Sequence, residues 1–290
     1  MLAMPGPSDA LAPDSGAPLA VLAGGGRLPI RLAEAVRRTG RPVLVLGLKG
    51  MAEAEIERFP HAWIGIGEIG RLFALLDRHG CRDLVLAGAV SRPQLSEISF
   101  DFGALKSLPN LIRILRGGDD RVLSEILHFF ESRGLRVVGA HDVAAELTAP
   151  AGSLTRRSPA ANDRTDIEIG LRAAHANGAL DIGQAVVVCD ERVVAVEAAE
   201  GTDDMLRRVA ELRAAKRLRS GPGTGVLVKC AKPQQDLRLD MPVVGATTVE
   251  LAGAAGLAGV AVEAGRTLLP EREEAVAAAD RLGLFLTGVG

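Results

Sequence analysis

Short apolar runs alternate with amphipathic stretches through the first half of the chain. The runs PLAVLAG, PVLVLGL and DLVLAGAV have the length and the β-branched content of buried strands. Between them, LPIRLAEAVRRTG and EIGRLFALLDRHG place apolar residues at helical spacing. Short buried strands that alternate with helices of about 10–14 residues are typical of a parallel, doubly wound sheet. The pattern therefore predicts an α/β domain with a Rossmann-like parallel sheet over residues 18–150.

The alternation stops at TAPAGSLTRRSPAANDRTD, where prolines and small polar residues are typical of a linker, which we place at residues 151–165. It resumes with the helix-like DIEIGLRAAHANGAL and with QAVVVCDERVVAVEA, which reads as two strands around an Asp-Glu turn. We predict a second α/β domain over residues 166–290. Residues 1–17 are rich in Pro, Gly, Ala and Ser, lack the regions of a signal peptide, and are expected to be a disordered leader.

Composition narrows the possible functions. The 290-residue chain has a formal net charge of −2 and 3% aromatic residues with no tyrosine, so it lacks the basic and aromatic character of nucleic-acid binders. Its three separated cysteines are expected to be small buried residues in a reducing compartment, and its histidines lack zinc-motif spacing. Because no apolar run reaches about 18 residues, we predict a soluble, cytoplasmic protein.

The first apolar run leads into three consecutive glycines at residues 24–26 and then into a helix-like stretch. A dinucleotide-binding loop needs G-x-G-x-x-G and an acidic residue about 20 positions later. Pro29 stands at the third glycine position and Gly47 where the acid is required, so we expect neither NAD nor flavin. Two interpretations stay open: a tight turn without a ligand, or a close approach to a phosphate or sugar, which amides at a helix N-terminus attract.

The segment KCAKPQQDLRLDM combines acidic and basic residues. Asp236, Arg238 and Asp240 alternate with apolar residues, so an extended chain would place them on one face, roughly 6.5–7 Å apart. Two carboxylates flanking a guanidinium can hold a hard cation and a phosphate, and Lys229 and Lys232 add groups that bind phosphoryl oxygens. The alternative is a solvated edge strand with a row of surface salt bridges.

A second acidic group, Glu197 and Glu200, precedes Thr202 and Asp203. One interpretation makes Thr202 the N-cap of a helix whose first turn carries aspartates that complement the helix dipole. Capping does not explain the two glutamates, because several carboxylates repel one another unless a cation or a basic ligand lies among them. Residues 98–118 are amphipathic, which fits core packing, a groove for acyl chains or contact with a membrane surface.

Several strings, AGGGRLP, GDDRVL, VEAAEGTD, KCAKPQQDLRLDMPVVG and AGVAVEAGRTLL, together resemble one family, the UDP-2,3-diacylglucosamine pyrophosphatases of the lipid A pathway (LpxI type). The likeness extends over about residues 18–288. It implies a homodimeric, magnesium-dependent hydrolase that cleaves the lipid-linked nucleotide-sugar to UMP and 2,3-diacylglucosamine 1-phosphate. It also implies two domains with the substrate in a cleft between them, and it is compatible with peripheral contact with the cytoplasmic face of the inner membrane.

The residue patterns and the resemblance together define an expected site. Its catalytic residues are Asp236, Asp240, Lys229, Lys232 and Arg238. Its substrate-binding residues are Gly24, Gly25, Gly26, Arg27, Gln235 and Thr202. Its ligands for Mg²⁺ or Mn²⁺ are Asp203, Asp236, Asp240 and Glu200. The alternative function is a non-catalytic module that binds a nucleotide-sugar or a lipid phosphate.

Overall fold

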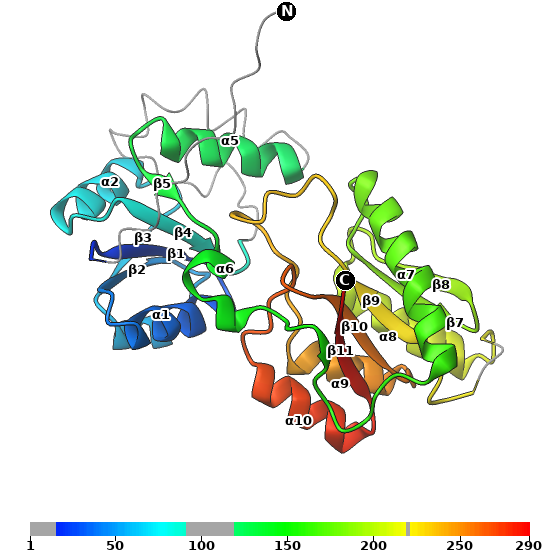
Figure 1. The fold of residues 1–290 in the computed structure, drawn as a ribbon. Helices are drawn as coiled ribbons and strands as arrows, with labels where there is room; N and C mark the ends of the chain where they lie inside the picture. The colour runs from blue at the N-terminus through cyan, green and yellow to red at the C-terminus, as the bar shows by residue number, and fades with distance from the viewer. Residues whose placement is uncertain (1–15, 91–118, 219–220) are drawn as a thin grey trace, which may run out of the picture.

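The computed structural model describes residues 16–90, 119–218 and 221–290, which form two α/β domains (Figure 1). The first domain contains a sheet of parallel strands in the order β3-β2-β1-β4-β5. The strands are β1 (Leu19–Ala23), β2 (Val43–Leu48), β3 (His61–Ile64), β4 (Asp83–Ala87) and β5 (Arg136–Val137). In this order β2 and β3 are added on one side of β1, and β4 and β5 on the other side. The arrangement is that of a Rossmann-like half and confirms the predicted fold class.

Both faces of the first sheet are covered. The helical elements are α1 (Leu28–Arg38), η1 (Ala54–Arg58), α2 (Ile69–Arg78), α5 (Asp119–Glu131), α6 (Ala140–Val143) and η3 (Ala145–Leu147). Side chains of α1 and α6 pack on one face, and side chains of α2 and α5 pack on the other. Strand β1 is buried along most of its length because both faces are covered, which is why its sequence is continuously apolar.

The second domain has a mixed sheet in the order β6-β11-β10-β9-β7-β8. Its strands are β6 (Gly152–Ser153), β7 (Ala185–Cys189), β8 (Arg192–Val196), β9 (Val226–Lys229), β10 (Gly259–Glu263) and β11 (Phe285–Val289). Its helices are α7 (Ala161–Ala179), α8 (Gly201–Ala214), α9 (Ala246–Ala254) and α10 (Arg272–Leu282). Helix α7 packs on one face, and α8, α9 and α10 pack on the other. The parallel strands β9, β10 and β11 form the centre of this domain.

The segment predicted as a linker, residues 151–165, takes part in the second domain. Strand β6 is the edge strand of the second sheet and pairs antiparallel with β11, and the amide of Leu154 donates to the carbonyl of Leu286 at 2.9 Å. Helix α7 already begins at Ala161, where Asp163 accepts the amide of Ala160. The prolines and small residues therefore form a short edge strand and a helix start, because an open sheet edge is stabilised by pairing.

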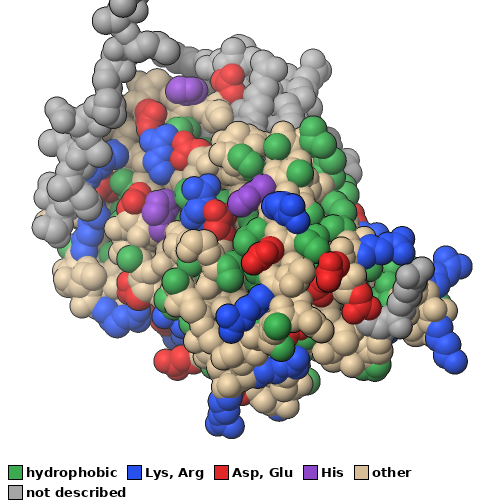
Figure 2. All heavy atoms as spheres, turned by 45° about the vertical axis from the view of Figure 1, so that its right-hand side comes forward, with side chains coloured by type: hydrophobic (Ala, Val, Ile, Leu, Met, Phe, Trp, Pro, Cys, Tyr) green, Lys and Arg blue, Asp and Glu red, His purple; other side chains and the backbone are tan. Residues whose placement is uncertain are grey.

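Among the described helices, none combines the length and the apolar content needed to cross a membrane. On the face shown in Figure 2, basic and acidic side chains are interspersed with apolar ones. The amphipathic segment 98–118, with its three alternative interpretations, lies outside the described residues.

Candidate active site

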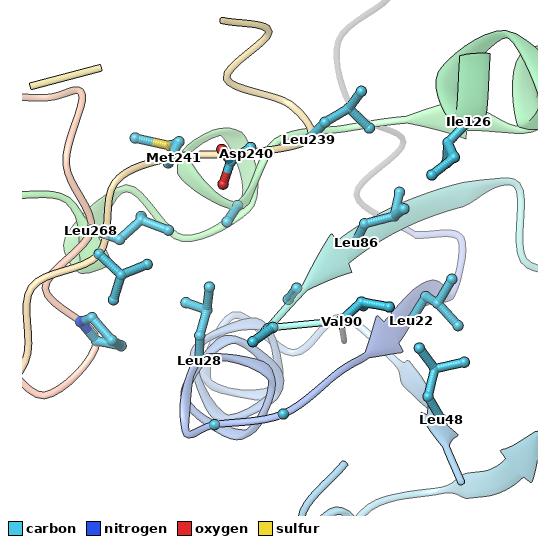
Figure 3. Close-up of a pocket in the computed structure, with 18 of the residues that line it drawn as sticks. Leu22, Leu28, Leu48, Leu86, Val90, Ile126, Leu239, Asp240, Met241 and Leu268 are labelled. Atoms are coloured by element: carbon cyan, nitrogen blue, oxygen red, sulfur yellow. The ribbon is translucent and has the colours of Figure 1, made fainter. Parts of the chain in front are cut away.

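A cavity of about 1080 Å³, which we call the interdomain cavity, is lined by residues of both domains. Its first-domain wall includes the glycine loop and the ends of the parallel strands, and its second-domain wall includes Asp203, Lys229 and Asp240. Figure 3 shows apolar side chains of the first domain on one side and the carboxylate of Asp240 on the other. The cavity lies where the family resemblance implies a cleft between the domains.

The first-domain wall is mainly apolar, although Arg27 and Glu68 also line it. The carboxyl ends of the parallel strands line the cavity with aliphatic side chains: Leu22 from β1, Leu48 from β2, Ile64 from β3 and Leu86 from β4. Ile126 of α5 lies on the same side as Leu22, Leu48 and Leu86 (Figure 3). The carboxyl ends of parallel strands are the usual ligand position in open α/β sheets. Because the side chains at this position are aliphatic, it can bind a hydrocarbon chain. The sequence alone does not distinguish these residues, because a leucine near a strand end is equally expected in a core.

The first two glycines of the loop are required by a close backbone approach. The amides of Gly24 and Gly25 donate to the carbonyls of Ala87 and Ala89 at 2.8 and 2.7 Å. A Cβ at Gly24 would lie 2.4 Å from the carbonyl oxygen of Ala89. These two amides therefore hold the chain that follows β4, and a phosphate would not displace them without breaking that contact. Gly26, at φ +86°, turns the chain into α1 and lines the cavity with Gly25.

Arg27 links the two domains at the rim of the cavity. Its guanidinium lies 3.1 Å from Glu55 of the first domain and 3.5 Å from Glu271 of the second. Since the side chain is about half exposed and also lines the cavity, it can approach a ligand while remaining paired.

Lys229, the last residue of β9, is buried and lines the cavity. Its Nζ donates to Thr202 Oγ1 at 2.9 Å and to the carbonyl of Val243 at 3.1 Å. Burial lowers the pKa of Lys229, while the charges of Glu197, Asp203 and Asp240 oppose that shift. The ammonium group is therefore held in one position by two acceptors and surrounded by carboxylates.

The predicted capping role of Thr202 is wrong. Helix α8 begins at Gly201 with Glu200 at the N-cap, and the Thr202 hydroxyl instead donates to Glu197 Oε1 at 2.8 Å while it accepts from Lys229. The second carboxylate oxygen of Glu197 accepts the amide of Gln184 at 3.1 Å. Glu197, left out of the expected site, thus supports Lys229 through Thr202.

Residues 236–240 form a turn, so the predicted extended strand is wrong. The amides of Leu239 and Asp240 donate to the carbonyl of Asp236 at 3.0 and 3.2 Å, and Asp236 Oδ1 accepts the amide of Arg238 at 3.0 Å. An Asp side chain that bonds to the backbone two residues later stabilises a local turn in competition with a strand. The apolar residues between the charges, Leu237 and Leu239, pack against the cores of the first domain.

Arg238 joins the turn to the first domain. Its guanidinium donates to Asp236 at 2.6 Å and to Glu131 of α5 at 3.2 Å. The hydrogen bonds from Arg238 are the largest cause of the lowered pKa of Asp236, and they outweigh burial, so that carboxyl is ionised. Arg238 lines the cavity with much of its charge already compensated.

Two of the expected site residues point elsewhere. Lys232 pairs through Nζ with Asp181, and Glu200 pairs with Arg208 at 2.7 Å. Neither is among the described residues that line the cavity. Gln235 is buried, accepts the amide of Lys232 at 3.0 Å and donates to Asp240 Oδ2, so it orients a carboxylate that does line the cavity.

Two of the carboxylates that line the cavity, Asp203 and Asp240, have the chemistry to hold a hard divalent cation. Asp203 at the start of α8 and Asp240 after the turn both lie close enough to Lys229 to influence its pKa. One or two carboxylates together with substrate phosphates are the usual ligands of Mg²⁺. Asp203 and Asp240 are therefore the residues that would hold such an ion.

The fold and the cavity define a two-domain α/β protein with an apolar wall facing a charged one. Residues 18–147 match the family model for the LpxI N-terminal domain, and residues 150–287 match that for the LpxI C-terminal domain. The chain is 47% identical over 271 residues to the UDP-2,3-diacylglucosamine pyrophosphatase LpxI of Caulobacter vibrioides (strain ATCC 19089 / CIP 103742 / CB 15), a match that covers 93% of this chain and 97% of the relative. The chain belongs to the LpxI family, which confirms the resemblance seen in the sequence.

Proposed function

We propose that this protein hydrolyses the pyrophosphate of UDP-2,3-diacylglucosamine to UMP and 2,3-diacylglucosamine 1-phosphate in lipid A synthesis, with Mg²⁺ or Mn²⁺. The relative from Caulobacter vibrioides, 47% identical, is named as a pyrophosphatase for this compound. The observation that carries the proposal is the pairing of an apolar wall with a charged wall in one cavity. A substrate with two acyl chains and a pyrophosphate needs both.

The first-domain wall would take the acyl chains. Leu22, Leu48 and Leu86 present aliphatic side chains at the strand ends, with Ile126 of α5 beside them (Figure 3). Each CH₂ group moved from water into such a surface contributes about 0.8 kcal/mol. Binding energy from these remote, unreactive groups can hold the pyrophosphate against the second-domain wall.

The second-domain wall would act on the pyrophosphate. Lys229, fixed by Thr202 and Val243, places a positive charge against the phosphoryl oxygens, where fixed charge stabilises the transition state most. Asp203 and Asp240 would hold the divalent ion, with Asp240 oriented by Gln235. When bound, that ion supplies charge neutralisation and lowers the pKa of a water molecule.

Asp236 and Arg238 would hold the second-domain wall in place. Their ion pair stabilises the turn that carries Asp240, and Arg238 extends it to Glu131 of the first domain. Because Leu237 and Leu239 are anchored in the first domain, this turn couples the two walls. Asp236 is not among the described residues that line the cavity. In place of the expected roles as catalytic residue and cation ligand, we therefore assign it the role of holding the charged wall at a fixed place relative to the apolar wall.

The test is incubation of the protein with UDP-2,3-diacylglucosamine in H₂¹⁸O, with and without Mg²⁺. We expect UMP release that requires the metal, and ¹⁸O in only one of the two products, which identifies the phosphorus attacked. Tight binding of the substrate without UMP release at any metal concentration would instead support a non-catalytic binding module.

We also propose that the protein is a homodimer that contacts the cytoplasmic face of the membrane. Sedimentation would test the dimer, and co-flotation with vesicles would test the membrane contact.

A further inference from the structure

Three potential metal ligands lie together in the second domain, outside the interdomain cavity. They are His175 of α7, Cys230 directly after β9 and Glu263, the last residue of β10. One ligand atom from each lies within 4.8 Å of the corresponding atoms of the other two. The three residues are separated by 55 and 33 positions, so no sequence motif could reveal them.

The group lies on the opposite face of the second sheet from Lys229. Side chains alternate between the two faces along a strand. Lys229 bonds to Thr202 of α8, whereas the next residue, Cys230, packs in the core that contains Ala174 of α7. Cys230 is therefore separated by the sheet from the carboxylates that would hold Mg²⁺.

The separation between His175 and Glu263 suits two ligands that share one ion. His175 Nε2 and Glu263 Oε2 lie 3.8 Å apart, too far for a hydrogen bond. Two such atoms on one tetrahedral zinc ion, each bonded at about 2.0–2.2 Å, lie roughly 3.3–3.6 Å apart. A small movement of the imidazole closes the difference, and His175 is free to make it because 44% of its side chain is exposed.

The carboxylate of Glu263 is oriented by neighbouring groups. Its Oε2 accepts the amide of Ala231 at 3.0 Å, and its Oε1 pairs with Arg266 at 3.1 Å. Bonds of this kind to a ligand atom are typical of metal sites, where they fix the ligand before the ion arrives. They also leave lone pairs on Oε2, since a carboxylate oxygen accepts more than one bond.

We propose that His175, Cys230 and Glu263 form a binding site for a zinc-class ion, with a fourth position open to solvent. A thiolate, an imidazole and one carboxylate together favour Zn²⁺ or Co²⁺ over Mg²⁺, which prefers oxygen ligands alone. Solvent exposure of His175 gives an ion a route to the buried sulfur.

Binding would proceed by ligand exchange without any redox change. The sulfur–hydrogen bond of Cys230 breaks, its proton passes to solvent, a metal–sulfur bond forms, and the ion loses water molecules. Burial raises the pKa of the Cys230 thiol to about 12, so the thiol is protonated until an ion binds. The bound ion would tie α7 to the start of the loop that continues to Gln235 and Asp240.

Titration of metal-free protein with Co²⁺ tests the proposal, because cobalt bound to a thiolate gives a charge-transfer absorption that an all-oxygen magnesium site cannot give. We expect one equivalent of this absorption, its removal by Zn²⁺, and its persistence in excess Mg²⁺. The variant Cys230→Ser should lose it. Cys81→Ser and Cys189→Ser, which alter the other buried cysteines, should keep it.

His175→Ala provides an independent test, because the side chain is 44% exposed and its removal leaves the core of the domain intact. This variant and Glu263→Gln should weaken cobalt binding by at least about tenfold. The proposal is overturned if wild-type protein shows no thiolate absorption with saturating Co²⁺. It is equally overturned if the absorption survives in Cys230→Ser, or if His175→Ala binds Co²⁺ with unchanged affinity. None of these outcomes depends on the proposed hydrolysis.

Discussion

The two walls of the interdomain cavity are built at equivalent places in their sheets and have opposite chemistry. In the first domain the strand ends carry Leu22, Leu48 and Leu86, and in the second domain the end of β9 carries Lys229. The parallel sheet determines where a ligand binds, since the carboxyl ends of its strands open into the crevice. The residues at those ends decide what binds. The same architecture can thus hold an acyl chain on one side and a phosphate on the other.

The charged wall should be the more sensitive of the two. Replacing Asp203 or Asp240 by Asn removes a proposed cation ligand, and we expect kcat to fall by about 10³-fold, the size of losing one strong transition-state interaction. Steady-state release of UMP measures this. Asp204→Asn is the matched control, because Asp204 is the next residue but is exposed and paired with Arg207. Folded Asp203 and Asp240 variants that keep full rates with Mg²⁺ would remove both from the mechanism.

Lys229→Met should lower kcat by about 10²-fold, because it removes the fixed positive charge and keeps the length of the side chain. The effect should appear in kcat more than in KM if the charge acts mainly on the transition state. Lys216→Met, at an exposed lysine of the same domain, serves as the control. Thr202→Val should give a smaller loss of the same kind, since it removes only the support of the ammonium group. Equal activities of the Lys229 and Lys216 variants would contradict the assignment.

The apolar wall should respond in KM. Leu86→Ala removes part of an aliphatic side chain from the cavity, and we expect KM for the diacylated substrate to rise by roughly tenfold with little change in kcat. A substrate with short acyl chains should be much less affected, and the ratio between the two substrates is the measurement. Leu180→Ala, at a leucine that is 73% exposed, should leave both constants unchanged. A loss in kcat with both substrates would show that Leu86 supports the charged wall instead.

The smallest effect on catalysis is expected at the other end of the first sheet. Asp83, at the start of β4, is buried between Arg41 and Arg136 at 2.5 and 2.7 Å. Burial raises its pKa, but the hydrogen bonds from the two arginines outweigh it and the net pKa is lowered. Asp83→Asn should reduce the free energy of unfolding by about 3 kcal/mol and leave kcat of the folded protein unchanged.

The pH dependence of this variant has a definite sign. A carboxyl whose folded-state pKa is lowered stabilises the protein above its unfolded pKa, about 3.9, and the contribution disappears as the pH falls through the folded value. The difference in stability between wild type and Asp83→Asn should therefore be full at neutral pH and shrink below about pH 4. Urea unfolding at a series of pH values measures it. A difference that does not change with pH would assign the effect to packing.

The sequence was sufficient for the fold class and the family, and for naming Lys229, Asp203 and Asp240, which line the cavity. Strand and helix periodicity is a local property, so the alternating elements of both domains are visible in the order of residues. Periodicity was misleading for residues 236–240, where alternating polar and apolar residues predicted a strand. The alternation has another cause, because Leu237 and Leu239 pack in a different domain from the one that carries the turn.

The order of residues by itself determined which elements form and which chemistry is present. Only the tertiary structure decided how the charged groups are used: Lys229 is held toward the cavity by Thr202 and Glu197, while Lys232 and Glu200 turn to Asp181 and Arg208. The physical reason is distance. Secondary structure depends on neighbours within a few positions, whereas the pairing of a charge depends on groups that folding brings together from distant parts of the chain.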